Sequence, residues 1–372
     1  MGMKYSDIVD YDKLDPFKEE AVRRFRKTIK HVKEFDFEIL EDSLGETAAV
    51  LDIGREDLLL AFGVEGLGTK IKVSEAMDHW EKIGEGIGLD RRRLFMGIGI
   101  DQCAMTWNDL TGVGAKPIVF EPIIATGSSS YFDDVQVRDG LLDGFEIAAE
   151  VVRVAIPGGE TPTLKGIVDP ETLDIAGGSM GVIKPKNRLT LGRAMKPGLK
   201  IYGLKSSGIH SNGLSLARRI ADSGRLLRGY YTELPSGRTF GEAILTPTVI
   251  YWPTIDALFK AGVDIFYQNP ITGHGFAKVM RNKKPFTYRI ENLPEIPEEF
   301  KLMMDAGPVT EEEAYKTFNM GVGWVIFAPA EDAGMVKTTC SMLGTEAYEL
   351  GVVEEGERQV ILEPINVTYR PR

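Results

Sequence analysis

The chain has 372 residues, 43% hydrophobic and 27% charged, which suits two domains with buried cores and argues against a wholly disordered chain. Its 44 Lys and Arg against 55 Asp and Glu give a net charge of −11, which argues against general nucleic-acid binding but not against a local basic pocket. Two cysteines cannot build a disulfide framework and fit a reducing compartment. No apolar stretch has the length of a signal peptide's core or a membrane span, so we expect a soluble, cytoplasmic protein without nucleic-acid or membrane partners.

The first half of the chain predicts an alternation of helices and strands. Asp15-Pro16 is a typical helix start, and the apolar residues from Phe17 to Val32 then recur on one face, so we expect a packed helix there. Short apolar runs bounded by turn residues predict strands over 48–53, 57–64, 118–125 and 174–183. Further helices are expected to begin at Ser74, Asp101 and Asp139.

The second half follows a polar connector, Lys184 to Arg188, that contains a proline. We place the domain boundary there, so the predicted domains are 1–184 and 185–372. Beyond it we expect strands at 200–205, 263–267, 322–328 and 359–362, and helices at 211–223, 247–261, 310–318 and 331–343. Residues 282–308, rich in Pro, Lys and Glu, are expected to form a surface excursion. Both halves are therefore mixed α/β.

Common site motifs are missing from the sequence. Gly63 to Lys70 comes close to a P-loop, but Thr69 precedes Lys70 and the order is wrong. Gly97-Ile98-Gly99 lacks the third glycine of a dinucleotide-binding motif, since Gln102 stands at that position. The four histidines are scattered, so a histidine-built metal site or a Ser-His triad has little support.

Four clusters combine small residues with carboxylates or hydrogen-bond donors. The first, Glu65-Gly66-Leu67-Gly68-Thr69-Lys70, follows a predicted strand. Glycines let a backbone approach an anion closely, Lys70 offers a positive charge, and Glu65 offers a metal ligand. A plain strand-end turn with a surface lysine fits the same letters.

The second cluster is Asn108-Asp109. Positions 101, 105, 108 and 109 share one face of a helix, and Met105 on that face is expected to point to the core. Asp109 should therefore be at least partly buried, where a carboxylate needs a cation or hydrogen-bond donors. A cap on a neighbouring backbone would serve equally well.

The third and fourth clusters lie in predicted loops. In Gly158-Gly159-Glu160-Thr161 the glycines free the backbone to present Glu160 at a sharp turn, although an ordinary helix-ending loop has the same composition. Ser206 to Gly213 follows a predicted strand and opens a predicted helix, whose free N–H groups can bind an anion. It has more donor side chains than a helix cap needs, which favours a function.

Glu65, Asp109 and Glu160 come from separate segments and, with a lysine and glycine turns, indicate Mg²⁺ and a polyphosphate if those segments converge. Magnesium prefers carboxylate and phosphate oxygens. It also neutralises the charge that develops in phosphoryl transfer.

The order of the clusters resembles that of the aminoimidazole ribonucleotide synthetases (phosphoribosylformylglycinamidine cyclo-ligases). These belong to an ATP-dependent superfamily with formylglycinamidine ribonucleotide synthetase, selenophosphate synthetase, thiamine-monophosphate kinase and a hydrogenase maturation factor. The similarity runs from about Leu44 to Val325 and rests on matches in the segments 66–70, 100–101, 108–110, 125–127, 158–161, 206–216, 245–248, 271–273 and 317–323. The block Ser206-Ser207-Gly208-Ile209-His210-Ser211-Asn212-Gly213 is the most specific for the cyclo-ligase branch.

This resemblance implies two α/β domains, with the N-terminal domains of two subunits forming a shared β-barrel in a homodimer. It implies ATP and Mg²⁺ as cofactors and a small-molecule nucleotide as substrate. The implied metal ligands are Glu65, Asp109 and Glu160, and the implied ATP contacts are Gly66, Gly68, Thr69, Lys70, Asn108, Asp109, Gly158 and Gly159. The implied substrate contacts are Ser206, Ser207, Gly208, His210, Ser211 and Asn212, with Lys70 and His210 as catalytic candidates.

The reaction implied is the ATP-dependent cyclisation of formylglycinamidine ribonucleotide to aminoimidazole ribonucleotide in purine synthesis. The γ-phosphate of ATP activates the formyl oxygen, an amidine nitrogen closes the ring, and phosphate leaves. An amide oxygen is a poor leaving group until it is phosphorylated, so the use of ATP makes chemical sense.

Three departures from the family pattern concern the identity of the substrate. Glu65 stands where Asp is usual, Pro162 to Gly166 replaces Ala-Glu-Met-Pro-Gly, and His274 interrupts the usual Thr-Gly-Gly-Gly. Two alternatives follow: a paralogous ATP-dependent phosphotransferase or ligase on another substrate, and a nucleotide-binding regulator without catalysis. Selenophosphate synthetase is disfavoured because no Cys precedes Gly66, and thiamine-phosphate kinase because of the Ser206 to Gly213 block.

Overall fold

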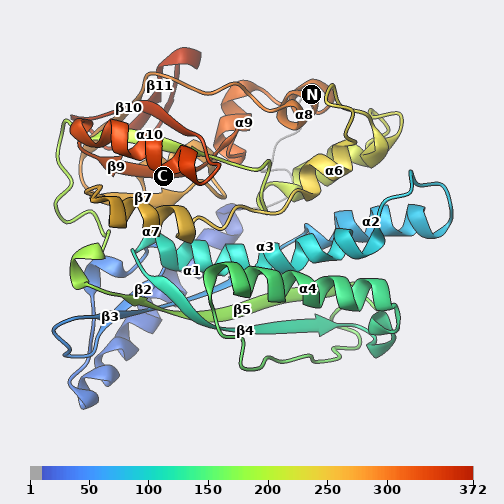
Figure 1. The fold of residues 1–372 in the computed structure, drawn as a ribbon, viewed down its shortest axis with the longest axis horizontal. Helices are drawn as coiled ribbons and strands as arrows, with labels where there is room; N and C mark the ends of the chain where they lie inside the picture. The colour runs from blue at the N-terminus through green and yellow to red at the C-terminus, as the bar shows by residue number, and fades with distance from the viewer. Residues whose placement is uncertain (1–10, 372) are drawn as a thin grey trace.

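The protein folds around two β-sheets (Figure 1), and the computed structural model describes residues 11–371. The first sheet is antiparallel, in the order β1-β2-β3-β5-β4. The second has the order β12-β11-β8-β10-β6-β9-β7, antiparallel except for the pair β11 and β8. The strands are β1 Glu38–Ile39, β2 Ala49–Asp52, β3 Leu59–Gly66, β4 Lys116–Thr126, β5 Leu173–Ile183, β6 Lys200–Lys205, β7 Tyr267–Pro270, β8 Phe286–Ile290, β9 Val322–Ala328, β10 Ala347–Glu355, β11 Gln359–Leu362 and β12 Val367–Tyr369.

The fold is mixed α/β with two domains, as the sequence predicts. Every strand of the first sheet precedes the connector at Lys184, and every strand of the second follows it. We therefore keep 1–184 and 185–372 as the proposed domain limits.

Helices cover one face of the first sheet and leave the other open. The covering helices are α2 Ile71–Lys82, α3 Arg91–Gly112 and α4 Val135–Val152, with α3 between the first sheet and the C-terminal half (Figure 1). On β3, Leu59, Ala61 and Gly63 are buried, whereas the alternate residues Phe62 and Val64 are 57% and 62% exposed. This period of two is typical of a sheet packed on one side only.

Glycines set the close packing of α3 against α4. A Cβ on Gly99 would lie 2.4 Å from the carbonyl oxygen of Leu141, and one on Gly144 would lie 2.1 Å from that of Met96. The Gly97-Ile98-Gly99 string thus serves helix packing. The expectation that Asp101 starts a helix is wrong, because α3 begins at Arg91 with Asp90 as its N-cap and Asp101 lies in its middle.

The second sheet has helices on both faces. On one face α7 Trp252–Ala261 and α10 Ala333–Met342 share a buried cluster with β6 and β9. The opposite face packs with α8 Glu298–Ala306, α9 Glu311–Thr317 and the short helix Gly275–Met280. Within the described residues the remaining α-helices are α1 Tyr11–Phe25, α5 Leu214–Ala221 and α6 Phe240–Leu245. Among the described residues no helix has both the length and the apolarity needed to span a membrane.

Three further expectations need correction. Residues 282–308 are no surface excursion, because they include β8, with Tyr288 buried, and α8. The first described helix, Tyr11–Phe25, continues as the 3-10 helix Arg26–Phe35, and its Phe17 and Phe25 are exposed, so it is not the packed helix expected. The strand expected at 263–267 instead begins at Tyr267. In the segment 282–308 turn-forming and charged residues flank the short alternating run that begins at Phe286, so the composition of the whole segment hides the strand β8.

Candidate functional site

A row of buried polar side chains on α3 joins the two halves of the molecule. Asp101 and Lys70 are both fully buried, and the Lys70 Nζ donates to Asp101 Oδ1 at 2.9 Å and lies 2.8 Å from Oδ2. Lys70 also donates to the carbonyl oxygen of Thr246, at 2.8 Å. The backbone N–H of Thr248 donates to Asp101 Oδ1 at 2.7 Å. One carboxylate of the N-terminal half thus organises a segment of the C-terminal half.

About two turns along α3 from Asp101, Asn108 continues this connection. Its Nδ2 donates to the carbonyl oxygen of Val249 at 2.8 Å, and its Oδ1 accepts from the N–H of Tyr251 at 2.9 Å. These bonds fix the extended chain before α7, where the sequence predicted a helix from Pro247. Asn108 was expected to contact ATP, but both ends of its amide are engaged here.

The Ser206 to Asn212 loop lies against the same segment. Ser211 Oγ donates to Asp101 Oδ1 at 3.1 Å, and Ser207 Oγ donates to the carbonyl oxygen of Pro247 at 2.6 Å. The Nδ2 of Asn319 donates to the carbonyl oxygen of Gly208 at 2.8 Å, and Ser206 Oγ donates to Asn319 Oδ1 at 3.1 Å. Much of the donor capacity that marked this loop in the sequence therefore shapes the loop itself.

His210 lies at the centre of this loop in the left-handed region, at φ 60°. It is buried, and its Nε2 accepts from the N–H of Ser207 at 3.3 Å. Burial, helped by the charge of Lys70, lowers the pKa of His210 to about 3. The imidazole is thus neutral at pH 7 and acts there as a hydrogen-bond acceptor.

Asp109 and Glu65 bring two carboxyl groups together where α3 passes the end of β3. Burial, followed by the adjacent charge and hydrogen bond of Glu65, raises the pKa of Asp109 well above its usual range. The positive charges of Arg281 and Lys278 oppose this shift. The backbones are held by Gln102 Nε2, which donates to the Glu65 carbonyl oxygen at 3.0 Å, and by Thr47 Oγ1, which donates to that of Asp109 at 2.6 Å.

The carboxylate pair fits a divalent cation. Two adjacent carboxylates repel each other unless a proton or a cation lies between them, and Mg²⁺ is often held by one or two carboxylates together with substrate phosphates. The structure thus brings together two of the three predicted metal ligands, Glu65 and Asp109.

Glu160 does not join this pair. Its segment pairs beyond β4, with the Glu160 N–H donating to the Pro122 carbonyl oxygen at 2.9 Å, so β5 and β4 separate it from Glu65. Glu160, Gly158 and Gly159 are exposed. Within residues 11–371 no group of three or more His, Cys, Asp or Glu side chains is arranged to hold a metal. The expected convergence of three carboxylates is therefore wrong for a single chain.

The glycine turn after β3 divides into exposed and buried parts. Gly66 and Gly68 are exposed, with Gly68 at φ 76°, and the hydroxyl groups of Thr69 and Ser215 lie 3.2 Å apart. Lys70, predicted to contact phosphate and take part in catalysis, instead points inward to Asp101. To reach a phosphate, its ammonium would have to break that buried ion pair.

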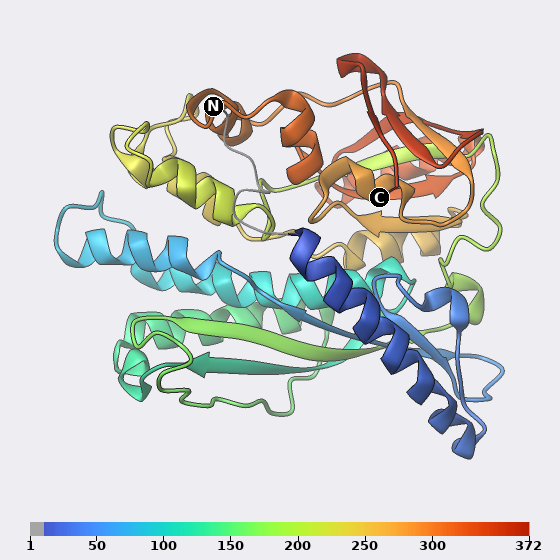
Figure 2. The ribbon, with the colours of Figure 1, turned by 180° about the vertical axis from the view of Figure 1, so that it is seen from behind.

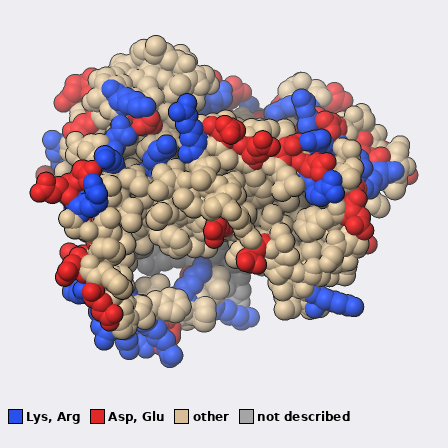
Figure 3. Space-filling model, turned by 60° about the horizontal axis from the view of Figure 1, so that its bottom comes forward, with Lys and Arg blue, Asp and Glu red and all other residues tan. Residues whose placement is uncertain are grey.

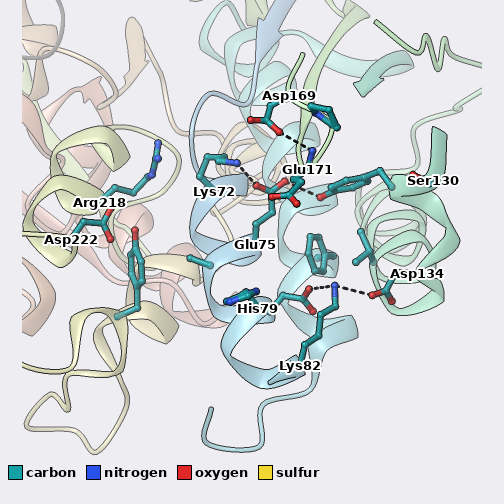
Figure 4. A pocket seen from close by; sticks show the side chains of 17 residues that line it. Lys72, Glu75, His79, Lys82, Ser130, Asp134, Asp169, Glu171, Arg218 and Asp222 are labelled. Atoms are coloured by element: carbon teal, nitrogen blue, oxygen red, sulfur yellow. Dashed lines mark hydrogen bonds and ion pairs between the residues drawn. The ribbon is translucent and has the colours of Figure 1, made fainter. Parts of the chain in front are cut away.

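Two large cavities flank this region. One, of about 610 Å³, lies beside α2 (Figure 4). Much of its charge is internally paired, as in Lys72 with Glu75 at 2.8 Å and Lys82 with Asp134 at 3.0 Å. The other, of about 590 Å³, lies near the Glu65–Asp109 pair and is here named the basic pocket. Its cations are Lys278, Arg281, Lys283, Lys316, Arg358 and Arg370.

The basic pocket was missed in the sequence, although a signal was present. Lys278, Arg281, Lys283 and Lys284 fall within seven positions of an acidic protein. Burial, followed by the charge of Arg281, lowers the pKa of Lys278 to about 8. Lys283 and Lys284 lie in the segment 282–308, whose composition predicts an exposed excursion rather than part of a site.

Comparison with known proteins assigns both halves of the chain to one family. The sequence models for "AIR synthase related protein, N-terminal domain" and "AIR synthase related protein, C-terminal domain" match residues 45–183 and 196–363. A phosphoribosylformylglycinamidine cyclo-ligase of Methanothermobacter thermautotrophicus is 36% identical over 320 residues, 86% of each chain. One of Carboxydothermus hydrogenoformans is 35% identical over 350 residues, 92% of this chain and 94% of the relative.

A solved structure supports the fold. A ThiL protein complexed with AMPPCP and TMP has a TM-score of 0.57 at 16% identity and covers 94% of both chains. At that identity the likeness concerns the fold alone. The two sequence models and the curated relatives carry the assignment further: the chain belongs to the AIR synthase related family of ATP-dependent enzymes, as the order of its sequence clusters predicted.

Proposed function

We propose that this enzyme cyclises formylglycinamidine ribonucleotide to aminoimidazole ribonucleotide, with ATP and Mg²⁺, in the purine synthesis of the cytoplasm. Two relatives at 36% and 35% identity are named phosphoribosylformylglycinamidine cyclo-ligases, and both are matched over most of their length. The observation that carries the proposal is the half-buried pair of Glu65 and Asp109 beside the positive charges of Lys278 and Arg281. Carboxylates next to cations suit a magnesium-bound polyphosphate and a phosphorylated substrate.

Glu65 and Asp109 would hold the metal, and phosphate oxygens would complete its coordination. Bound there, Mg²⁺ would neutralise charge on the transferred phosphoryl group. Glu160 could take part only if a loop movement or a second copy brought it closer, so the proposed metal site rests on the first two residues.

The exposed turn at Gly66 and Gly68 is the proposed contact for the ATP phosphates. Its backbone can approach an anion closely because glycine has no side chain there. Lys70 and Asp101 do not contact the phosphates in this proposal. They hold the Ser206 to Asn212 loop at the domain junction. These two are positioning residues in this proposal.

The proposed chemistry transfers the γ-phosphoryl group of ATP to the formyl oxygen of the substrate and releases ADP. The amidine nitrogen then attacks the formyl carbon, the C–O bond breaks, and the oxygen leaves with the phosphate. A neutral His210 whose Nε2 accepts from Ser207 carries its proton on Nδ1, so in this proposal it would donate a hydrogen bond during ring closure rather than take up a proton.

The proposal includes a homodimer in which the open faces of two first sheets close a shared barrel. Phe62, Val64 and Ile123 on that face are 57%, 62% and 47% exposed. Figure 3, which turns the bottom of the molecule forward, shows charged residues around the edge of a face whose middle is largely uncharged. An exposed apolar patch of this kind typically marks an interface.

An assay of ADP release tests the proposed reaction. Purified, folded protein with MgATP should release ADP when formylglycinamidine ribonucleotide is added and form aminoimidazole ribonucleotide in equal amount. Asp109→Asn should lose most of the rate, while Asp305→Asn, an exposed aspartate of α8, should retain it. No ADP release from folded wild-type protein would reject this substrate.

A further inference from the structure

The basic pocket has a charge opposite to that of the whole protein. The chain carries a net charge of −11, yet among the residues that the structure describes the pocket is lined by six Lys and Arg side chains and one acidic side chain, Glu312. These cations come from separate places in the chain: the short helix Gly275–Met280 and the residues after it, α9, the start of β11 and the C-terminal segment. The fold therefore gathers charges that the sequence keeps apart.

Most of these cations lack an acidic partner. In the part of the chain that the structure describes, Lys278, Lys283, Lys316 and Arg370 form no ion pair. Arg281 lies 3.5 Å from Glu46, and Arg358 donates to the carbonyl oxygen of Met280 at 3.0 Å. The cavity in Figure 4 differs, because Lys72 and Lys82 there are neutralised by neighbouring carboxylates. Gathered cations without partners repel one another, and a bound anion would relieve that repulsion.

The shape and the remaining lining of the pocket suit an organic phosphate. Ala277, Met280 and the buried ring of Tyr369 supply apolar surface next to the cations. The cavity of about 590 Å³ is in the size range of small-molecule sites and exceeds the needs of a bare inorganic anion. Lys278 of this pocket lies near enough to Asp109 and Glu65 for their charges to raise its pKa against the effect of burial.

We propose that the basic pocket binds the 5′-phosphate of the ribonucleotide substrate, with Lys283, Lys316 and Arg370 as its main phosphate contacts. The identity of the ribonucleotide rests on the proposed function, whereas recognition of a sugar phosphate rests on the pocket alone. The loop expected to contact the substrate, Ser206 to Asn212, is less suited to hold that phosphate, because the side chains of Ser206, Ser207 and Ser211 donate to protein acceptors. A charge-assisted contact to a phosphate is stronger than a neutral one.

The proposal can be tested without catalysis by measuring, in a calorimeter, the binding of ribose 5-phosphate to the full-length protein. Ribose 5-phosphate should bind and ribose should not. Each of Lys283→Ala, Lys316→Ala and Arg370→Ala should weaken the binding about tenfold, the effect of losing one charge-assisted contact. These side chains are exposed, so the variants should fold normally. Lys337→Ala, an exposed lysine of α10, is the matched control and should bind like the wild type.

The outcomes separate the substrate phosphate from the ATP phosphates. Ribose 5-phosphate that binds equally well with saturating MgATP present supports the proposal, whereas competition with MgATP would assign the pocket to ATP and overturn it. Equal binding by the pocket variants and Lys337→Ala would also overturn it. If the pocket binds ribose 5-phosphate but formylglycinamidine ribonucleotide yields no ADP, the proposed reaction fails and the phosphate pocket stands. If the reaction proceeds with the same KM in all variants, the pocket assignment fails alone.

Discussion

Lys70 and Asp101 of the N-terminal half form an ion pair at the domain junction, with Nζ and Oδ2 2.8 Å apart and neither side chain exposed. Asp101 lies on α3 of the N-terminal half, yet Thr248 and Ser211 of the other half also donate to it. The pair therefore couples the glycine turn after β3 to the Ser206 to Asn212 loop.

Replacing one partner of this pair should be costly. We expect Lys70→Met to lower the free energy of unfolding by about 3 kcal/mol, because the Asp101 carboxylate is left buried without its cation. Urea unfolding measures this, and Lys337→Met is the control for loss of an exposed lysine. If Lys70 is a positioning residue, the folded variant keeps its affinity for MgATP. Unchanged stability with lost ATP affinity would instead make Lys70 a phosphate contact.

Asp109→Asn should stabilise the protein while removing its activity. The pKa of Asp109 is raised in the folded state. The free energy of unfolding therefore falls as the pH rises above the pKa that Asp109 has in the unfolded chain. Thermal unfolding without Mg²⁺ should show a gain of about 1 kcal/mol that is larger at pH 8 than at pH 4. Asp305→Asn should show no such pH dependence. A variant less stable than the wild type at pH 8 would contradict repulsion between Glu65 and Asp109.

His210 should lower the free energy of unfolding at acidic pH. Its pKa of about 3 in the fold lies below the unfolded value, so the unfolded chain binds the extra proton first and stability falls as pH drops below about 6.5. The difference in unfolding free energy between the wild type and His210→Asn should shrink by roughly 1.4 kcal/mol per pH unit from pH 6 to pH 4. Parallel stability profiles for the two proteins would show that the imidazole is not held neutral.

Gly99 should tolerate no side chain. In Gly99→Ala the new Cβ would meet the Leu141 carbonyl oxygen at 2.4 Å, which forces α3 and α4 apart and should cost about 2 kcal/mol or more. Gly334→Ala in α10 is the matched control, since no atom lies within 4 Å of its Cβ and the helix should gain up to about 1 kcal/mol. Equal effects of the two substitutions in urea unfolding would refute tight packing at the α3–α4 contact.

Charge on the open face of the first sheet should separate the proposed dimer. Val64→Glu places a carboxylate in the proposed interface, where it would be buried without a partner. Light scattering coupled to gel filtration should find a dimer for the wild type and a monomer for the variant. Ile167→Glu, a highly exposed residue outside the sheet strands, is the control and should stay dimeric. A monomeric wild type at micromolar concentration would reject the barrel.

The sequence by itself determined the class of fold, the family and most of the strands. Short apolar runs such as the one ending at Val64 and the run Val322–Ala328 are local signals, so they predicted β3 and β9 without tertiary information. The ordered clusters, from Gly66 to Asn319, identified the family because several dispersed matches are jointly specific.

Only the tertiary structure decided what the polar residues do. Lys70 and Asp101 are far apart in sequence, and their burial depends on how α3 packs against the C-terminal half. Sequence spacing alone therefore could not show that Lys70 is a buried lysine rather than a surface one. It also could not show that Asp101 is a buried partner rather than a helix cap. Glu65 and Asp109 meet because β3 and α3 cross, whereas β5 and β4 keep Glu160 away. The basic pocket, too, is formed only by the tertiary structure. Its charges come from segments about ninety residues apart, and long-range packing, which no local pattern encodes, brings them together.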